Sequence, residues 1–302
     1  MNLPTVRQLE CLVAVAEKLH FGHAAEACYV TQPALSAQIQ QLETLLGVKL
    51  FERDRRKVLP TAAGDVLARR AGAILADLHD FTEAAAAFKG PLSGTLRLGV
   101  IPTAAPYVLP RASREVKRRY PQLRLLLREG QTADLLEHLA DGSLDVLLLA
   151  LEAELGDVET LPLFSDPFVL AVPSDHRLAK RKKVAEKDLL DEQVLLLDDG
   201  HCLRDQALSI CSRSGAFELG DFRASSLTTL AQMVAGGVGV TLLPELSIGV
   251  EGVSSGLALV PFGARGPRRT IGLAWRRSSL RQSEFRHLGE AVRHGLGRTG
   301  KA

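Results

Sequence analysis

The sequence contains no apolar run long enough to cross a membrane. Its longest runs, at residues 146–151 and 238–243, are much shorter than the roughly 18 residues that a membrane-spanning helix needs. The N-terminal stretch MNLPTVRQLE also has neither the basic head nor the apolar core of a signal peptide. We therefore expect a cytoplasmic protein that has no contact with a membrane.

Cysteine is scarce, with four residues in a chain of 302. We expect free thiols, because a permanent disulfide would not persist in the reducing cytoplasm. Neither Cys11 nor Cys28 belongs to a Cys-x-x-Cys pair with a matching histidine cluster, so we expect no metal site and a packing role for both. Any paired use of cysteines in such a chain would instead indicate signalling or catalysis.

Neither sign of charge dominates, because 37 Lys and Arg residues face 35 Asp and Glu residues. A formal net charge of +2 does not by itself predict a nucleic-acid partner. Locally, however, Arg53, Arg55, Arg56 and Lys57 are opposed only by Asp54. This short basic tip is a candidate for contacts with DNA phosphates.

The pattern of apolar residues divides the chain near Gly90. Before this point the apolar residues follow helical spacing, and an alanine-rich stretch at residues 62–88 ends the helical part. After it, amphipathic segments alternate with short apolar runs, namely TLRLGVI, LRLLLRE, DVLLLAL, FVLAVP, QVLLLD and VGVTLLP. Buried strands that alternate with helices predict parallel sheets of the α/β class, which bind ligands beyond the carboxyl ends of their strands.

The segment FGHAAEACYVTQPALSAQIQQLETLLG has the pattern helix, tight turn, helix. Thr31 is placed to cap the second helix, and Pro33 lies in its first turn, where a missing amide hydrogen is harmless. The small residues that let the first helix pack closely are Ala24, Ala25 and Ala27. The second helix would turn an apolar face to the core, made of Leu35, Ile39 and Leu42.

The opposite face of this second helix is polar and suits the edges of bases in the major groove of DNA. The residues predicted to contact DNA here are Thr31, Gln32, Pro33, Ser36, Gln38 and Gln40. An ordinary helical hairpin with a solvated face is the alternative interpretation.

A short charged hairpin and a long helix follow, in the order GVKLFERDRRKVLPTAAG. This succession resembles the LysR-type transcription regulators. The resemblance implies a winged helix-turn-helix domain at residues 1–61, a linker helix for dimerisation at residues 62–90 and a regulatory domain at residues 91–302. One departure is the pair Gln40 and Gln41, which stands where relatives often carry Arg or Lys for a phosphate contact.

The implied regulatory domain is an α/β domain of two lobes, like the periplasmic binding proteins. Lobe I would comprise about residues 91–164 and 269–302, and lobe II about residues 165–268. The implied partners are double-stranded promoter DNA, further copies of the chain in homodimers and homotetramers, and RNA polymerase. The resemblance implies no cofactor.

A second motif, DDGHCLRDQALSIC at residues 198–211, resembles the peroxide-sensing branch of the same family. The resemblance implies a regulator of oxidative-stress genes, an activator or repressor and not an enzyme. Hydrogen peroxide would switch it through a reversible disulfide between Cys202 and Cys211, and thioredoxin-type or glutaredoxin-type reductants would reverse the switch.

The residues around Cys202 also favour this chemistry directly. Cys202 begins a helical pattern, and the first turn of a helix favours an anion. With His201 and Arg204 beside it, we expect a lowered pKa and a thiolate that attacks peroxide to give a sulfenic acid. Cys211 follows the apolar Ile210, so we expect it to be buried and to resolve the sulfenic acid. Two packed, unreactive thiols are the alternative.

Further residues are assigned to the site by the resemblance. Thr103 in the IPT motif and Thr132 in EGQT are implied to bind peroxide through their hydroxyl groups, and Arg269 in PRRT to stabilise the thiolate. The alternatives are a loop contact for Thr103, a helix cap for Thr132 and a surface ion pair for Arg269. The neighbours of the thiol that complete the candidate set are His201, Arg204 and Asp205.

Two other functions stay open. One is a LysR-type regulator that responds to a small metabolite, and the other is a thiol peroxidase. The spacing of Cys202 and Cys211 disfavours the metabolite regulator, and the helix-turn-helix disfavours the enzyme.

The same spacing predicts a large conformational change. Nine residues of α-helix separate Cys202 from Cys211 by about 13 Å along the helix axis and place them on opposite faces. A disulfide needs Cα atoms roughly 4.4 to 6.8 Å apart. We therefore expect the helix at residues 203–210 to unwind before the bond closes.

Overall fold

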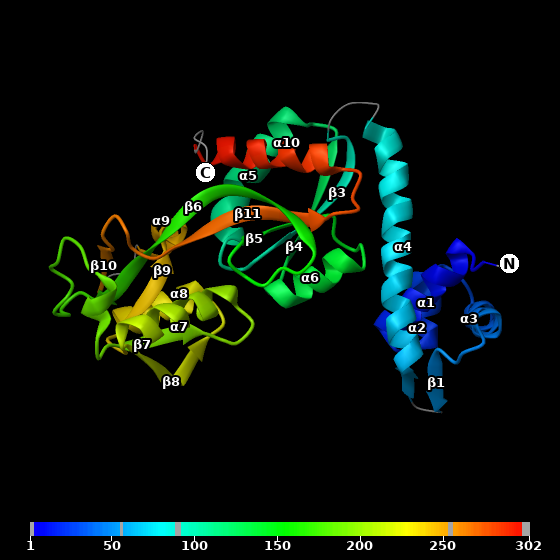
Figure 1. Ribbon diagram of the computed structural model, residues 1–302, viewed down its shortest axis with the longest axis horizontal. Helices are drawn as coiled ribbons and strands as arrows, with labels where there is room; N and C mark the ends of the chain where they lie inside the picture. Colours follow the sequence, from blue (N-terminus) through cyan, green and yellow to red (C-terminus); the bar gives the residue numbers. More distant parts are fainter. Residues whose placement is uncertain (1–2, 55–56, 88–91, 253–255, 298–302) are drawn as a thin grey trace.

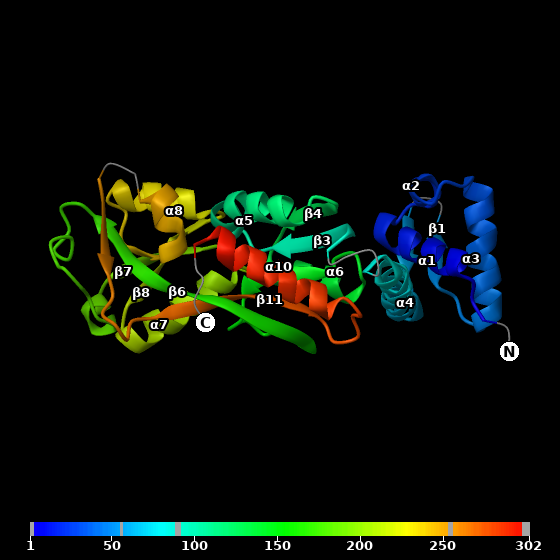
Figure 2. The same ribbon diagram turned by 90° about the horizontal axis from the view of Figure 1, so that it is seen from above.

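The computed structural model describes residues 3–54, 57–87, 92–252 and 256–297. A small helical domain lies at one end of the molecule and a larger α/β domain at the other (Figure 1). One long helix runs beside the small domain toward the large one, and it is seen nearly end-on in Figure 2. Along the described residues, no helix combines the length and the apolar character that crossing a membrane requires.

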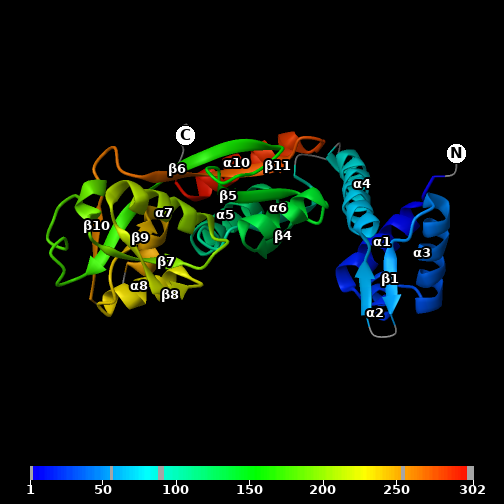
Figure 3. The same ribbon diagram turned by 60° about the horizontal axis from the view of Figure 1, so that its bottom comes forward.

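The small N-terminal domain is built from three helices and a hairpin. Its elements are α1 (Val6–Lys18), α2 (Phe21–Ala27), α3 (Gln32–Leu46), β1 (Phe51–Asp54) and β2 (Lys57–Pro60). Helix α3 begins directly after Thr31, as predicted, although the Thr31 side chain forms no capping hydrogen bond. The antiparallel strands β1 and β2 form a wing beside the helices (Figure 3).

The core of this domain confirms the helical pattern of the sequence. Leu35, Ile39 and Leu42 of α3 are fully buried. Ala24 and Ala25 of α2 are also buried. The packing role predicted for Ala27 is wrong, because α2 turns residues 24, 25 and 28 inward and this face leaves Ala27 exposed.

Helix α4 (Ala62–Ala87) connects the two domains. Its first turn is fixed by Thr61, whose hydroxyl accepts a hydrogen bond from the Gly64 amide at 3.0 Å. Only glycine fits at position 64, because a Cβ atom there would lie 2.0 Å from the Leu50 carbonyl oxygen. Further along, Ala76 lies against Gly142 of the α/β domain, where a Cβ atom on Gly142 would approach to 1.8 Å. Helix α4 therefore contacts both domains closely.

The α/β domain consists of two lobes. Lobe I holds β3 (Gly94–Val100), α5 (Ala105–Arg119), β4 (Leu123–Glu129), α6 (Thr132–Ala140), β5 (Val146–Ala150), the first part of β6 (Val158–Pro173), β11 (Arg268–Arg276) and α10 (Gln282–Gly295). Lobe II holds the second part of β6, β7 (Gln193–Leu197), α7 (Cys202–Ser214), β8 (Phe217–Ala224), α8 (Leu227–Ala235), β9 (Thr241–Pro244), α9 (Ile248–Glu251) and β10 (Leu257–Pro261). Two short 3₁₀ helices cover Glu186–Leu189 and Glu245–Ser247.

A mixed sheet joins the lobes in the strand order β10, β6, β11, β5, β3, β4, and β9 also pairs with β6. Strand β6 crosses from lobe I, where it pairs with β11, into lobe II, where it pairs with β9 and β10. The predicted parallel pairing is right for β3 with β4 and β5, and for β7 with β8. It is wrong for β6 and β9, which pair antiparallel. Strands β10 and β11, which the sequence did not predict, are also antiparallel to their neighbours, because the chain crosses between the lobes in both directions.

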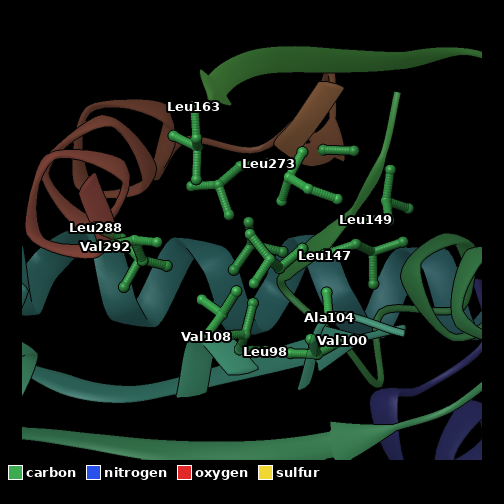
Figure 4. Close-up of a cluster of buried hydrophobic side chains, with 14 of the residues drawn as sticks. Leu98, Val100, Ala104, Val108, Leu147, Leu149, Leu163, Leu273, Leu288 and Val292 are labelled. Carbon is green, nitrogen blue, oxygen red and sulfur yellow. The ribbon is translucent and has the colours of Figure 1, made fainter. Parts of the chain in front are cut away.

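Each lobe has its own hydrophobic core. In lobe I, α5 and α10 pack side by side on the face of the sheet that carries Leu98 and Leu273 (Figure 4), and Leu147 lies on the opposite face, near Leu135 of α6. The run DVLLLAL forms β5, whose five residues are all buried, as predicted. The run LRLLLRE forms β4, but the prediction of a buried strand is wrong, since β4 is the edge strand and most of its side chains are exposed.

Candidate functional site

The candidate site is built around Cys202, the first residue of α7. The chain leaves β7, turns through Gly200 and enters the helix after His201, which occupies the N-cap position. Gly200 has φ of +90°, and a Cβ atom there would lie 2.1 Å from the Gln131 side-chain oxygen. Only glycine therefore lets this loop lie so close to lobe I, and the close approach places the Cys202 thiol at the junction of the lobes.

The candidate residues from three separate parts of the chain meet in one crevice. Thr103 follows β3, Thr132 begins α6, and both line the crevice together with His201 and Cys202. Each of these four residues is buried. The crevice is too narrow in this conformation to admit a water-sized molecule, so a molecule that enters it must displace side chains.

Arg269 is held at the base of this site by a fully buried network. Its Nε donates to the Asp166 carboxylate at 2.9 Å, its Nη1 to the Thr103 hydroxyl at 2.9 Å, and its Nη2 to the Thr103 carbonyl oxygen at 3.0 Å. Arg269 and Asp166 are both 0% exposed, so the surface ion pair considered for Arg269 does not exist. The other Asp166 oxygen accepts the Leu246 amide at 2.9 Å. The guanidinium is therefore fixed in position with little room to move.

The Thr132 hydroxyl lies beside the Cys202 thiol and helps to lower its pKa. It is buried, yet it has no hydrogen-bond partner of ordinary geometry among the described residues. A buried hydroxyl without a partner costs about 1 to 3 kcal/mol. An incoming polar molecule that reached Thr132 would relieve this cost.

Burial dominates the protonation of Cys202. Cys202 is 8% exposed as a residue, and burial raises the pKa of its thiol above the ordinary value. The charge of Arg269 and the Thr132 hydroxyl act in the opposite direction, and the charge of Asp205 raises the pKa further. The lowered pKa predicted from the helix start is therefore wrong for this closed conformation, because the loss of water outweighs the helix dipole. The role of Asp205 as a thiolate-stabilising residue is wrong for the same conformation.

His201 and Arg204 do not act on the thiol as predicted from their place in the motif. Burial lowers the pKa of His201, which favours the neutral imidazole and removes a positive charge beside Cys202. Arg204 turns away and forms ion pairs with Glu218 at 2.8 Å and Asp199 at 2.9 Å. Arg204 therefore ties the loop before α7 to β8, and the cation near the thiol is Arg269.

Cys211 lies in the same continuous helix but in a different core. It is buried, as predicted, among the apolar residues of lobe II. Cys202, in contrast, packs into the core of lobe I. All four cysteines are free thiols. The two thiols of α7 therefore face opposite lobes, and they can meet only if the helix unwinds.

A larger cleft of about 770 Å³ lies along the outer side of α7, between the lobes. Cys202 and Thr132 form one end of its wall, and Gln206 lines it further along the helix. Both polar atoms of the Gln206 side chain are buried, and neither has a partner within the part of the chain that the structure describes. This amide sits between the two cysteines, so α7 carries a local destabilising feature at the segment that must unwind.

The predicted DNA-contacting residues lie on the outer side of α3. Thr31, Gln32, Pro33 and Gln40 are exposed, whereas Ser36 and Gln38 are half-buried. Arg53 ends the wing strand β1 together with Asp54, and Lys57 begins β2. Arg55 and Arg56 lie outside the described residues.

Sequence reasoning missed four residues that shape these sites. Asp166 and Glu218 anchor Arg269 and Arg204, and Gln131 closes the loop at Gly200 through a hydrogen bond to the Asp199 carbonyl oxygen at 3.3 Å. In the helix-turn-helix turn, Tyr29 is 95% exposed with φ of +54°. The signal available for Tyr29 was an aromatic residue in a turn, but no sequence signal marks a long-range ion-pair partner.

The chain combines a winged helix-turn-helix, a linker helix and a two-lobed α/β domain with a buried thiol where the lobes meet. This combination defines a DNA-binding regulator that carries its sensor domain in the same chain. The family model for the bacterial regulatory helix-turn-helix protein of the lysR family matches residues 6–65. The model for the LysR substrate binding domain matches residues 89–297.

Named relatives cover nearly the whole chain. A probable hydrogen peroxide-inducible genes activator from Streptomyces viridosporus is 48% identical over 97% of this chain and 95% of its own. Full-length OxyR from Pseudomonas aeruginosa, with a cysteine replaced by aspartate, superimposes with a TM-score of 0.81 at 34% identity over 97% of this chain and 96% of its own. A hydrogen peroxide-bound cysteine-to-serine mutant of OxyR from Corynebacterium glutamicum gives 0.69 at 40% identity over 98% and 94%. The chain belongs to the LysR family of regulators, in its OxyR group.

Proposed function

We propose that this protein senses hydrogen peroxide through Cys202 and regulates the transcription of oxidative-stress genes through a reversible disulfide between Cys202 and Cys211. The observation that carries the proposal is the convergence of Cys202, Arg269, Thr103 and Thr132 at the lobe junction. The resolving thiol, Cys211, is available on the same helix. The names of the relatives refer to hydrogen peroxide and so support hydrogen peroxide as the signal.

The reaction begins when peroxide enters the crevice and bridges the two threonines. The Thr132 hydroxyl gains a hydrogen-bond partner of good geometry, which the described residues do not provide, and the Thr103 hydroxyl, which accepts from Arg269, has its own proton free to donate. The positive charge of Arg269 favours the thiolate, which is a minor species while the site is closed. Peroxide binding and thiolate formation are thus coupled.

The chemical step forms a sulfur–oxygen bond and breaks the O–O bond. The Cys202 thiolate attacks one peroxide oxygen, and the other oxygen leaves as hydroxide and takes a proton to become water. Cys202 is then a sulfenic acid. The Cys211 sulfur attacks the Cys202 sulfur, a second water leaves, and the disulfide is complete. The two sulfur atoms are oxidised by two electrons together, and the peroxide is reduced to water.

Oxidation changes the packing of both lobes. A sulfenic oxygen on Cys202 adds a polar atom to a thiol that packs in the core of lobe I. Cys202 can reach Cys211 only by leaving that core while α7 unwinds. The change at the lobe junction would alter how lobe I supports α4, and with it the spacing of paired DNA-binding domains.

The remaining partners follow from this function. The polar face of α3 reads the bases of double-stranded promoter DNA, and the wing contacts phosphates. Homodimers form through α4 and assemble into homotetramers, and the DNA-bound protein acts on RNA polymerase. Thioredoxin-type or glutaredoxin-type reductants reopen the disulfide in the cytoplasm. The protein consumes about one peroxide per cysteine pair and does not act as an enzyme.

One experiment tests sensing and DNA binding together. Purified protein is titrated with hydrogen peroxide while the disulfide is followed by peptide mapping and operator contacts by footprinting. Cys202→Ser should abolish the footprint change and leave operator binding intact, since thiol and DNA reader lie in different domains. Ser209→Ala, on the exposed side of α7, is the matched control and should respond like the parent. An unchanged response in Cys202→Ser would contradict the proposal.

A metabolite-responsive regulator is the second candidate, because the cleft of about 770 Å³ between the lobes has the size of a small-molecule site. The same titration separates the candidates. A metabolite regulator would not respond to stoichiometric peroxide, and a thiol peroxidase would consume many equivalents in the presence of a reductant.

A further inference from the structure

A second pair of thiols lies in the N-terminal domain, far along the chain from the site described above. Cys11 in α1 is fully buried, and Cys28, directly after α2, is 7% exposed. Both belong to the same hydrophobic core. The Cys28 thiol donates weakly to the Glu10 carbonyl oxygen at 3.9 Å, next to Cys11 in the chain. The two side chains are therefore neighbours across the contact between α1 and α2.

The charges around this pair also indicate that the sulfur atoms lie close together. Burial first, and then the neighbouring Cys28 thiol, raise the pKa of Cys11 to about 11, while the charge of Arg7 lowers it. Arg7 is partly exposed, contacts the Cys28 carbonyl oxygen and pairs with Glu10 at 2.8 Å. A cation thus stands beside the thiol pair, where its charge opposes the effect of burial on Cys11.

The position of Cys28 connects this pair to DNA recognition. Cys28 directly follows α2 and is followed in turn by Tyr29, whose positive φ of +54° forms the tight turn before α3. A turn that depends on a non-glycine residue in the left-handed region tolerates little displacement of its neighbours. Any bond that pulls Cys28 toward α1 therefore moves the start of α3, where Gln32 faces outward.

We propose that Cys11 and Cys28 form a second redox-active dithiol, which closes to a disulfide at higher peroxide than Cys202 requires and then lowers operator affinity. It goes beyond the sensing function proposed for the α/β domain. The higher threshold follows from the surroundings of each thiol: Cys202 borders a cleft and has the Thr132 hydroxyl and the Arg269 charge beside it, whereas Cys28 is 7% exposed and Cys11 is fully buried among apolar residues.

The reaction uses hydrogen peroxide as the oxidant. The Cys28 sulfur, as its thiolate beside Arg7, attacks one peroxide oxygen, the O–O bond breaks, and hydroxide leaves with a proton as water. The Cys11 sulfur then attacks the Cys28 sulfenic acid, the S–S bond forms, and the S–O bond breaks. The proton of Cys11 leaves with the hydroxyl group as a second water. Two thiols are oxidised by two electrons, and one peroxide is reduced.

The test uses the full chain with Cys202→Ser and Cys211→Ser, so that the sensing pair is absent and failure of the sensing function cannot affect the result. After treatment with increasing hydrogen peroxide, peptide mapping without reductant should find Cys11 linked to Cys28. Fluorescence anisotropy should show operator affinity falling by about tenfold or more, the effect of displacing one good base contact. Dithiothreitol should restore it.

The matched control adds Cys11→Val, which keeps an apolar side chain of similar size in the core. This variant should bind the operator with the same affinity before and after peroxide, and its thermal unfolding by circular dichroism verifies that it is folded. If Cys11→Val does not fold, the Cys202→Ser, Cys211→Ser protein, which keeps both Cys11 and Cys28, still tests the proposal by itself. Both thiols remaining free to alkylation at high peroxide would overturn the proposal. So would a linked pair with unchanged operator affinity, or, in the wild-type chain, a Cys11–Cys28 link that forms before the Cys202–Cys211 link.

Discussion

Arg269 can be tested for two separate effects, one on stability and one on the reactivity of Cys202. Arg269→Met removes the ion-pair partner of a carboxylate that is 0% exposed, and among the described residues it leaves Asp166 with the hydrogen bond from the Leu246 amide. Breaking a buried pair from one side costs roughly 3 to 5 kcal/mol of unfolding free energy. We therefore expect Arg269→Met to be strongly destabilised.

The double variant Asp166→Leu with Arg269→Met removes both charges and fills the space with apolar atoms. Replacing a whole buried pair in this way is often close to neutral, so most of the lost stability should return. The reactivity of Cys202 should not return, because Arg269 no longer lowers the pKa of the thiol or holds the Thr103 hydroxyl. We expect peroxide oxidation to be slower by about one to two orders of magnitude in both variants, the effect of losing 1.5 to 3 kcal/mol of charge-assisted hydrogen bonding.

Urea unfolding measures the stability, and alkylation of quenched samples measures the rate of Cys202 oxidation. Arg281→Met is the matched control, since Arg281 is equally buried in an ion pair with Glu284 but belongs to a different site in lobe I. It should be destabilised and yet oxidise at the wild-type rate. The reasoning is refuted if the double variant reacts with peroxide like the wild type, or if it stays as unstable as Arg269→Met alone.

Three further predictions concern α7 and α3. Gln206→Leu replaces an amide that has no partner among the described residues. It should therefore stabilise the reduced protein by about 1 to 2 kcal/mol in urea unfolding and slow the closure of the disulfide. The control Ser209→Ala, at a neighbouring exposed position, should have neither effect. Burial lowers the pKa of His201 from its ordinary value of 6.5, so the folded state binds the proton less readily than the unfolded state and loses stability as the pH falls. Urea unfolding between about pH 5 and pH 8 should show this slope in the wild type and a flatter one in His201→Asn. Gln32→Ala should weaken binding to the operator more than to random DNA in anisotropy titrations, and equal losses on both would exclude a base contact.

Local patterns predicted much of the fold. The apolar spacing of α3 identified Leu35, Ile39 and Leu42 as core residues, because a helix on a small domain can bury only one face. The run that forms β5 was recognisable because a central strand with neighbours on both sides is apolar throughout. The edge position of β4 was not recognisable, since its leucine-rich sequence resembles that of a central strand and only the sheet order reveals its exposure.

The sequence predicted which residues belong to the candidate site, but it did not predict how their charges and their burial affect the thiol. The motif placed Cys202 at a helix start, and this follows from sequence alone. The direction of its pKa depends on burial at the lobe junction and on Arg269, which is 67 positions away along the chain. Arg204 was assigned to the thiol because it is two positions away, but its guanidinium pairs with Glu218 in β8 instead. Nearness in sequence does not determine which way a long side chain turns.

The distribution of the two thiols over two cores explains how a small chemical change can move a large structure. As long as Cys202 is a thiol, its burial in lobe I and the burial of Cys211 in lobe II hold α7 between the lobes. A sulfenic acid weakens only the lobe I side. The Gln206 amide, which has no partner among the described residues, lowers the free energy needed to unwind the segment between the thiols. The disulfide then closes a loop of about ten residues, and the chain-entropy model assigns such a crosslink a stabilisation of roughly 2.7 kcal/mol. This is of the same order as the conformational entropy lost when a few residues become ordered. When two packings of α7 differ so little in free energy, the formation of a single bond can convert one into the other, and the reduction of that bond is sufficient to reverse the change.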